Sequence, residues 1–93
     1  MEEIKSYIQN NAKLIDVRTP EEFAEGSVKG SLNYPLDKIE FYFSVLKKDE
    51  PIVVFCRSGN RSGQAKRILE KAGYNKIING GAWITVKEII KSL

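Results

Sequence analysis

The residues with the clearest chemical potential lie in one polar segment that directly follows an apolar run. Cys56 is the only cysteine in the 93 residues, and it stands between Ile52-Val53-Val54-Phe55 and Arg57-Ser58-Gly59-Asn60-Arg61-Ser62. A single cysteine forms no disulfide within the chain, and the sequence has no histidine to act as a general base or as a metal ligand. If Cys56 reacts, groups other than imidazole must activate it.

The segment after Cys56 has the composition of an anion-binding loop. Ser58, Gly59 and Asn60 allow the backbone to curl tightly and to point several N–H groups at one place. A thiolate there would be stabilised by the start of a following helix and by the two arginines of the segment. Together these would lower its pKa below the free value of about 8.5. We therefore predict that Cys56 is a nucleophile at neutral pH.

The alternative interpretation is that Cys56 is an unreactive core residue at the end of a buried strand, since free cysteines are often buried. The flanking residues argue against it. A core position would not be followed by six residues that include two arginines, two serines and an asparagine. We expect the loop residues Arg57, Ser58, Gly59, Asn60, Arg61 and Ser62 to bind the substrate.

Alternating strand and helix patterns predict an α/β fold around a mainly parallel sheet. Apolar runs predict strands at 14–17, 31–34, 52–55 and 76–78, and helical spacing of apolar residues is found over 2–9, 20–26, 36–46, 65–72 and 83–93. Thr19-Pro20-Glu21-Glu22 is typical of a helix start, and Asn79-Gly80-Gly81 is predicted to form a turn. Cys56 would then lie at the carboxyl end of a strand, where ligands bind in open α/β sheets.

Two further residues are expected near this edge of the sheet as supporting residues. Asp16 follows the first apolar run, and it could accept hydrogen bonds from the Cys56 loop or pair with one of its arginines. The other possibility is that Asp16 only stabilises the fold by accepting from nearby backbone donors. Arg18 is expected to form an ion pair with Glu22, four residues later, rather than to contact substrate.

Length and composition limit what else the chain could do. Ninety-three residues make one domain, 1–93, and we expect no metal and no cofactor. The net charge of +3 is too small and too scattered to indicate a nucleic-acid partner. The sequence shows neither a signal peptide nor an apolar run that could enter a membrane, so a cytoplasmic location is expected.

Three blocks of the sequence together resemble the rhodanese domains. The first runs from Leu14 to Phe23 and continues with Gly26, Gly30, Asn33 and Pro35. The second is the loop Cys56–Ser62, and the third is Asn79-Gly80-Gly81 followed by Trp83. The chain departs from the family at Ser27, where many relatives have a histidine, and this change leaves local packing or donor preference open.

This resemblance implies a rhodanese-like three-layer fold with a five-stranded sheet and a sulfurtransferase reaction. Cys56 would accept a sulfur atom from thiosulfate or from a protein persulfide and pass it to cyanide or to a thiol. The backbone amides of the loop would hold the persulfide, while Arg57 and Arg61 would bind the sulfonate group of the donor.

Two other functions compete with sulfur transfer. A cysteine phosphatase or arsenate reductase places its arginine six positions after the cysteine, whereas Arg61 follows Cys56 by five and position 62 is Ser. The smaller loop fits a single sulfur atom better than a tetrahedral oxyanion. A partner-dependent sulfur carrier or protein-binding module with little activity of its own remains open, as do the natural donor and acceptor, the pathway and the oligomeric state.

Overall fold

Four strands and five helical segments alternate along residues 2–93, which are the part of the chain described by the computed structural model. In chain order they are α1 (Glu2–Gln9), β1 (Lys13–Asp16), α2 (Pro20–Glu25), β2 (Leu32–Asn33), the 3₁₀ helix η1 (Leu36–Val45), β3 (Ile52–Cys56), α3 (Asn60–Lys71), β4 (Ile77–Ala82) and α4 (Trp83–Lys91). Each strand and helix predicted from the apolar patterns is present near its predicted position, although the segment expected to be an α-helix at 36–46 is a 3₁₀ helix.

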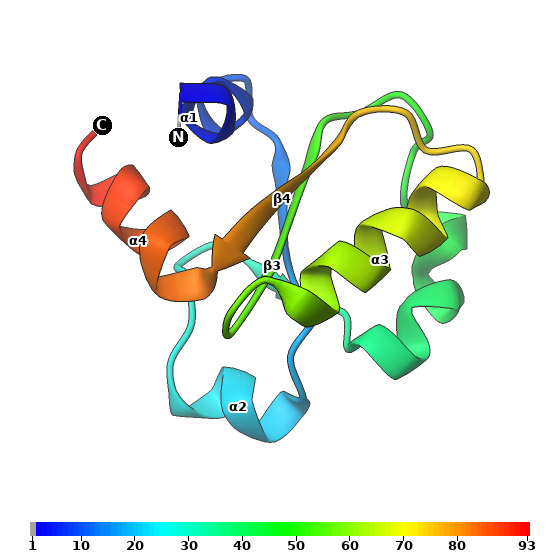
Figure 1. Ribbon diagram of the computed structural model, residues 1–93, viewed down its shortest axis with the longest axis horizontal. Coiled ribbons are helices and arrows are strands. Elements are labelled where there is room, and N and C mark those ends of the chain that lie inside the picture. Colours follow the sequence, from blue (N-terminus) through cyan, green and yellow to red (C-terminus); the bar gives the residue numbers. More distant parts are fainter. Residues whose placement is uncertain (1) are drawn as a thin grey trace.

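The strands form one fully parallel sheet in the order β2-β1-β3-β4, so β3 with Cys56 lies in its interior (Figure 1). The prediction of five strands is wrong for the described residues, which form four. The apolar runs of the sequence predict only the four strands that form, and the fifth was implied by the family resemblance alone. The segment before β1 has its apolar residues at helical spacing and forms α1, whose Ile4 belongs to the same buried cluster as Val86 and Ile89 of α4.

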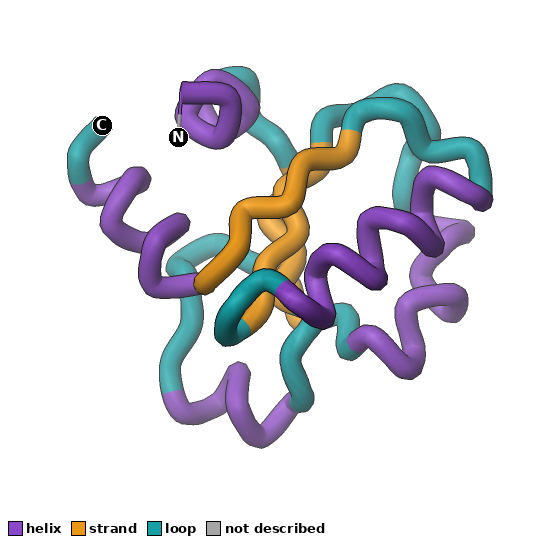
Figure 2. Tube along the Cα trace, in the orientation of Figure 1, coloured by secondary structure: helices purple, strands orange, loops and turns teal. Residues whose placement is uncertain are grey.

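Helices cover both faces of the sheet, so the molecule has three layers (Figure 2). On one face, α1 and α4 pack against a cluster that includes Val53 and Phe55 of β3. On the other, α3 and η1 enclose a cluster that includes Ile15, Val54 and Leu69. All five residues of β3 are buried, as expected for a strand that contacts helices on both sides.

The start of α2 follows from its first four residues. The Thr19 side chain accepts a hydrogen bond from Glu22 N–H, the Glu22 carboxylate accepts from Thr19 N–H, and Pro20 occupies the first helical position. This is the capping box predicted from the sequence. It places α2 close to the carboxyl ends of β1 and β3.

The predicted turn at Asn79-Gly80-Gly81 is wrong, because β4 continues through these residues to Ala82. The strand bulges instead of turning: Val54 pairs with Asn79, but the next residue, Phe55, pairs with Gly81. Gly80 packs against the cluster shared by β3 and α4, and a Cβ there would come within 2.9 Å of both Val53 Cγ1 and Val86 Cγ2.

None of the helices among residues 2–93 is long and apolar enough to cross a bilayer; the longest α-helix, α3, has 12 residues.

Candidate active site

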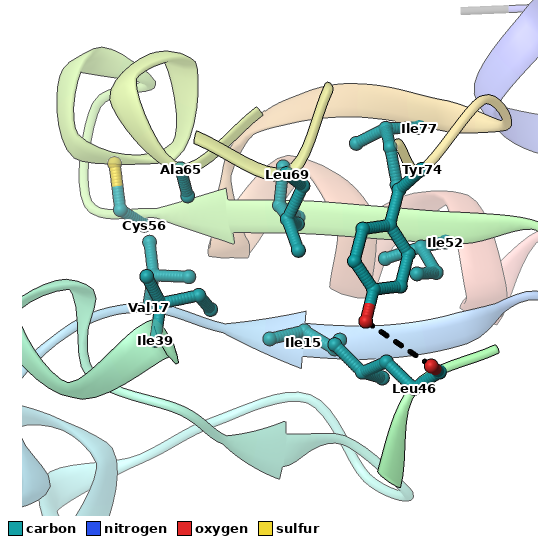
Figure 3. Packing of buried hydrophobic residues seen from close by; sticks show 11 residues of the cluster. Ile15, Val17, Ile39, Leu46, Ile52, Cys56, Ala65, Leu69, Tyr74 and Ile77 are labelled. Atoms are coloured by element: carbon teal, nitrogen blue, oxygen red, sulfur yellow. Dashed lines mark hydrogen bonds between the residues drawn. The ribbon is translucent and has the colours of Figure 1, made fainter. Parts of the chain in front are cut away.

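Cys56 is the last residue of β3, and its side chain is almost completely buried, with 1% of its surface exposed. It closes one end of the cluster between β3, α3 and η1, with its sulfur pointing toward the loop that begins α3 (Figure 3). Ala65 of α3 and Val17 lie beside it. Only a small group can reach a sulfur atom that is enclosed in this way.

Two polar groups of the following loop contact the sulfur. Gly59 N–H donates to Cys56 Sγ over 3.0 Å, and Ser62 Oγ lies 3.4 Å from Sγ. The loop reaches this shape because Gly59 has a φ of +100°, which side-chain-bearing residues rarely adopt. A Cβ on Gly59 would also lie 3.3 Å from Gly81 Cα, so the loop backbone packs directly on β4.

These contacts favour the thiolate form of Cys56. Burial by itself raises the pKa of the thiol, but hydrogen bonds from the Ser62 hydroxyl and from the amides of Ser62, Ser58 and Gly59 outweigh it. The resulting pKa is about 7, compared with an ordinary value of 9.0. The two arginines of the loop were predicted to contribute to this lowering, but in the structure hydrogen bonds dominate it.

The side chain of Arg61 is paired with Glu22. The guanidinium NH1 and NH2 donate to the two carboxylate oxygens over 2.6 and 3.0 Å. This hydrogen bond from Arg61 is the main reason that the pKa of Glu22 falls to about 2. The predicted pair between Arg18 and Glu22 is therefore wrong. Because Arg61 is paired with Glu22 on α2, its guanidinium is less available to bind the donor than the sequence predicted.

Arg18 instead pairs with Asp16, two residues earlier. Arg18 N–H, Nε and NH2 all donate to the carboxylate over 2.7–3.0 Å, and the two side chains are 5% and 0% exposed. Arg18 NH2 also donates to Gly26 O over 2.6 Å, and its guanidinium carbon lies 4.6 Å from the centre of the Trp83 ring. Asp16 thus does not pair with an arginine of the Cys56 loop, one of the two roles considered for it. It is part of a buried scaffold beneath the site.

Arg57 is exposed and has no acidic partner among the described ion pairs. It lines a cleft of about 400 Å³ between α2 and α4, next to the Cys56 loop; the other lining residues are Arg18, Glu22, Glu25, Gly26, Trp83 and Ile84. Ser58 is also exposed, and Asn60 Oδ1 accepts from Gln64 Nε2 along α3 over 3.4 Å. Of the predicted loop ligands, Arg57 is the charged side chain most open to an anion.

The remaining evidence on the site comes from known proteins. The family model for the rhodanese-like domain matches residues 1–82, which include both β1 and the whole Cys56 loop. The chain belongs to the rhodanese family.

Named relatives agree with this membership. A putative mitochondrial thiosulfate sulfurtransferase of Schizosaccharomyces pombe is 41% identical over 93 residues, covering 85% of this chain and 66% of that protein. The thiosulfate sulfurtransferase PspE of Escherichia coli is 39% identical over 69 residues, covering 72% and 66%. The chain thus spans just under two thirds of each. The human single-domain sulfurtransferase TSTD1 superposes with a TM-score of 0.79 at 30% identity, covering 95% and 92%.

One polar residue of this rhodanese domain was not foreseen as part of the site. The side chain of Asn79 in β4 contacts Ser62 and Gly59, the two residues next to the Cys56 sulfur. The available signal was an asparagine directly before two glycines in a segment that resembles the family's C-terminal motif. The same composition is also typical of a turn. Ser27, the departure from the family pattern, lies half-buried just after α2.

Among residues 2–93, no group of three or more His, Cys, Asp or Glu side chains is arranged to hold a metal ion.

Proposed function

We propose that this rhodanese domain is a sulfurtransferase in which Cys56 carries sulfane sulfur as a persulfide. The observation that carries the proposal is the Cys56 sulfur at the base of a tight loop, 3.0 Å from Gly59 N–H and 3.4 Å from Ser62 Oγ. A pKa of about 7 makes a large share of the cysteine a thiolate near neutral pH without histidine.

Thiosulfate is the proposed test donor. The Cys56 thiolate attacks the outer sulfur of thiosulfate, a new S–S bond forms, and the S–S bond of thiosulfate breaks as sulfite leaves with the bonding electron pair. The terminal sulfur of the persulfide then carries the negative charge. Cyanide or a thiolate attacks that sulfur, and Cys56 leaves again as thiolate, so the cycle needs no external oxidant or reductant.

The loop amides suit the charge of the terminal sulfur. Gly59 N–H already points at Sγ, and the amides of Ser58 and Ser62 also favour negative charge there. Because the side chain of Cys56 is 1% exposed, the loop accommodates one added sulfur atom better than a tetrahedral oxyanion. This argues for sulfur transfer over phosphate or arsenate chemistry.

We assign binding of the donor's sulfonate group to Arg57. It is exposed at the mouth of the cleft beside the loop, and a guanidinium binds oxyanions through paired N–H groups. Arg61 contributes indirectly, by anchoring the first turn of α3 to Glu22 on α2. We also propose a cytoplasmic location.

Steady-state kinetics with thiosulfate and cyanide test the function. Double displacement predicts parallel lines when the reciprocal of the rate is plotted against the reciprocal of thiosulfate concentration at several cyanide concentrations. Thiocyanate formation should disappear in Cys56→Ser. Slow turnover of thiosulfate combined with rapid loading from a protein persulfide would identify a sulfur carrier instead. If no donor loads Cys56 with sulfur, the domain would instead be a protein-binding module.

A further inference from the structure

The side chain of Asn79 connects the two groups that contact the Cys56 sulfur. Its Nδ2 donates to Gly59 O over 3.1 Å, and its Oδ1 accepts from Ser62 Oγ over 2.7 Å. Oδ1 also accepts from Gly81 N–H over 2.9 Å. The bulge in β4 brings the asparagine to this position, because it changes the pairing with β3 just after Asn79.

Ser62 has one hydroxyl proton and two neighbours that can accept it. The amide Oδ1 of Asn79 cannot donate, so the proton in the 2.7 Å contact belongs to Ser62. In the thiol form of Cys56, the S–H group therefore donates to Ser62 Oγ across the 3.4 Å contact. Once Cys56 is ionised, Sγ can only accept, and the Ser62 hydroxyl must rotate from Asn79 toward the sulfur to bond to it.

This rotation leaves no buried polar atom without a partner. When Ser62 turns toward Cys56, Asn79 Oδ1 keeps its hydrogen bond from Gly81 N–H. Ser62 itself is completely buried, so water cannot replace either of its side-chain contacts. The two orientations of one hydroxyl thus correspond to the two protonation states of the cysteine.

We propose that Asn79 is a positioning residue of the sulfur-transfer site, which holds Gly59 through Nδ2 and competes with Cys56 for the hydroxyl proton of Ser62. The proposal deepens the proposed function and rests on it, since it concerns how readily the sulfur-carrying nucleophile forms. Asn79 does not contact Sγ itself. It sets the thiolate population of Cys56 through Ser62 and Gly59.

The charged groups on the segments near the cysteine stay unchanged in the test. They are Arg57 in the loop, Arg61 on α3, Glu22 on α2, Asp16 and Arg18 at the end of β1, and Asp37 on η1, which lines a groove with Arg61.

The substitution Asn79→Asp tests the proposal, because three effects act in one direction. The carboxylate binds the Ser62 proton more strongly than an amide does, it cannot donate to Gly59 O, and it adds negative charge. We expect the midpoint of thiolate formation to rise by at least about one pH unit. The midpoint is measured on the full chain from the ultraviolet absorbance of the thiolate, with Cys56→Ser as the baseline.

Asn75→Asp is the matched control. It makes the same change at an exposed site just before β4. This site is at the end of the sheet opposite to Cys56, because the start of β4 pairs with Ile52 and its end, Ala82, pairs with Cys56. Its midpoint should not move. An unchanged midpoint in Asn79→Asp, or an equal rise in Asn75→Asp, overturns the proposal.

Repeating Asn79→Asp in the Ser62→Ala background separates positioning from simple charge repulsion. If Asn79 acts through Ser62, the rise in the midpoint should shrink by about half a unit or more once the hydroxyl is absent. An equal rise in both backgrounds would contradict that route. Thermal unfolding checks that the variants fold. If Asn79→Asp does not fold, Asn79→Leu is used in its place. In the Ser62 background the Asn79→Leu midpoint should lie lower, relative to its parent, than in the Ser62→Ala background, because the freed Ser62 proton can bind the thiolate.

The titration needs no sulfur donor, so the two proposals fail separately. If Cys56 takes up no sulfur but the midpoints change as expected, the proposed function is rejected and the coupling between Asn79 and Cys56 stands. If Cys56 takes up sulfur normally but the midpoints do not change, the proposed function stands and the coupling is rejected.

Discussion

Glu22 on α2 and Arg61 in the first turn of α3 are 39 residues apart in sequence and form a two-point ion pair, with N–O distances of 2.6 and 3.0 Å. The same carboxylate completes the capping box with Thr19. One side chain therefore ties the start of α2 to the helix that begins at the Cys56 loop. This relationship explains why the two arginines of the loop, alike in sequence, have different roles.

Glu22→Gln should destabilise the fold by about 1 kcal/mol, because it removes a partly buried ion pair and weakens a cap. The effect should depend on pH. The folded-state pKa of Glu22 is about 2, below its ordinary 4.5, so the pair contributes fully above pH 4.5 and is lost as pH falls toward 2. Urea unfolding of the wild type and of Glu22→Gln between pH 2 and pH 7 measures this difference in stability. The control is Glu70→Gln, which breaks the exposed ion pair with Lys66. A stability difference that stays constant down to pH 2 would contradict the assignment.

Arg57→Ala should lower kcat/KM for thiosulfate about tenfold, mainly through KM, because one charge-assisted contact to the donor is lost. Stability should stay unchanged since Arg57 is exposed. Arg67→Ala removes another exposed arginine, on α3, and should leave kcat/KM unaltered. Equal losses in both variants would mean that general positive charge, rather than Arg57, attracts the donor.

Arg18→Met should cost about 3–5 kcal/mol of stability, because it leaves the Asp16 carboxylate buried without its partner. The double variant Asp16→Asn/Arg18→Met should recover part of this loss, since no buried charge remains. Chemical denaturation measures both. A loss below about 1 kcal/mol in the single variant would show that this pair is not part of the scaffold beneath the site.

The rate of sulfur loading from thiosulfate should rise with pH and level off above about 7, because the thiolate is the attacking form and the pKa of Cys56 is about 7. Ser62→Ala removes the side-chain hydrogen bond that lowers this pKa, so its profile should be displaced to higher pH. Single-turnover release of sulfite follows the reaction. Identical profiles for the two proteins would show that Ser62 does not stabilise the thiolate.

Features set by neighbouring residues were predicted well from the sequence. The apolar run before Cys56 and the polar loop after it place the cysteine at a strand end, and the residues from Thr19 to Glu22 encode the start of α2. These signals are local, and the structure contains both features.

Features set by contacts across the fold were not predicted. The partner of Glu22 lies on another helix, so spacing along one helix suggested Arg18 instead. Asn79-Gly80 has the composition of a turn, yet the segment is a strand that pairs with β3, and Val53 and Val86 pack closely against Gly80. The fifth strand came from the family resemblance rather than from a pattern in this chain.

The most direct test of the account is the intact mass of the protein after incubation with thiosulfate, for the wild type and for Cys56→Ser, before and after cyanide is added. We expect that the wild type gains one sulfur atom, that cyanide removes it with formation of thiocyanate, and that Cys56→Ser gains nothing. A wild type that gains no sulfur from thiosulfate or from a protein persulfide, or a Cys56→Ser variant that gains as much as the wild type, would contradict the central role of Cys56.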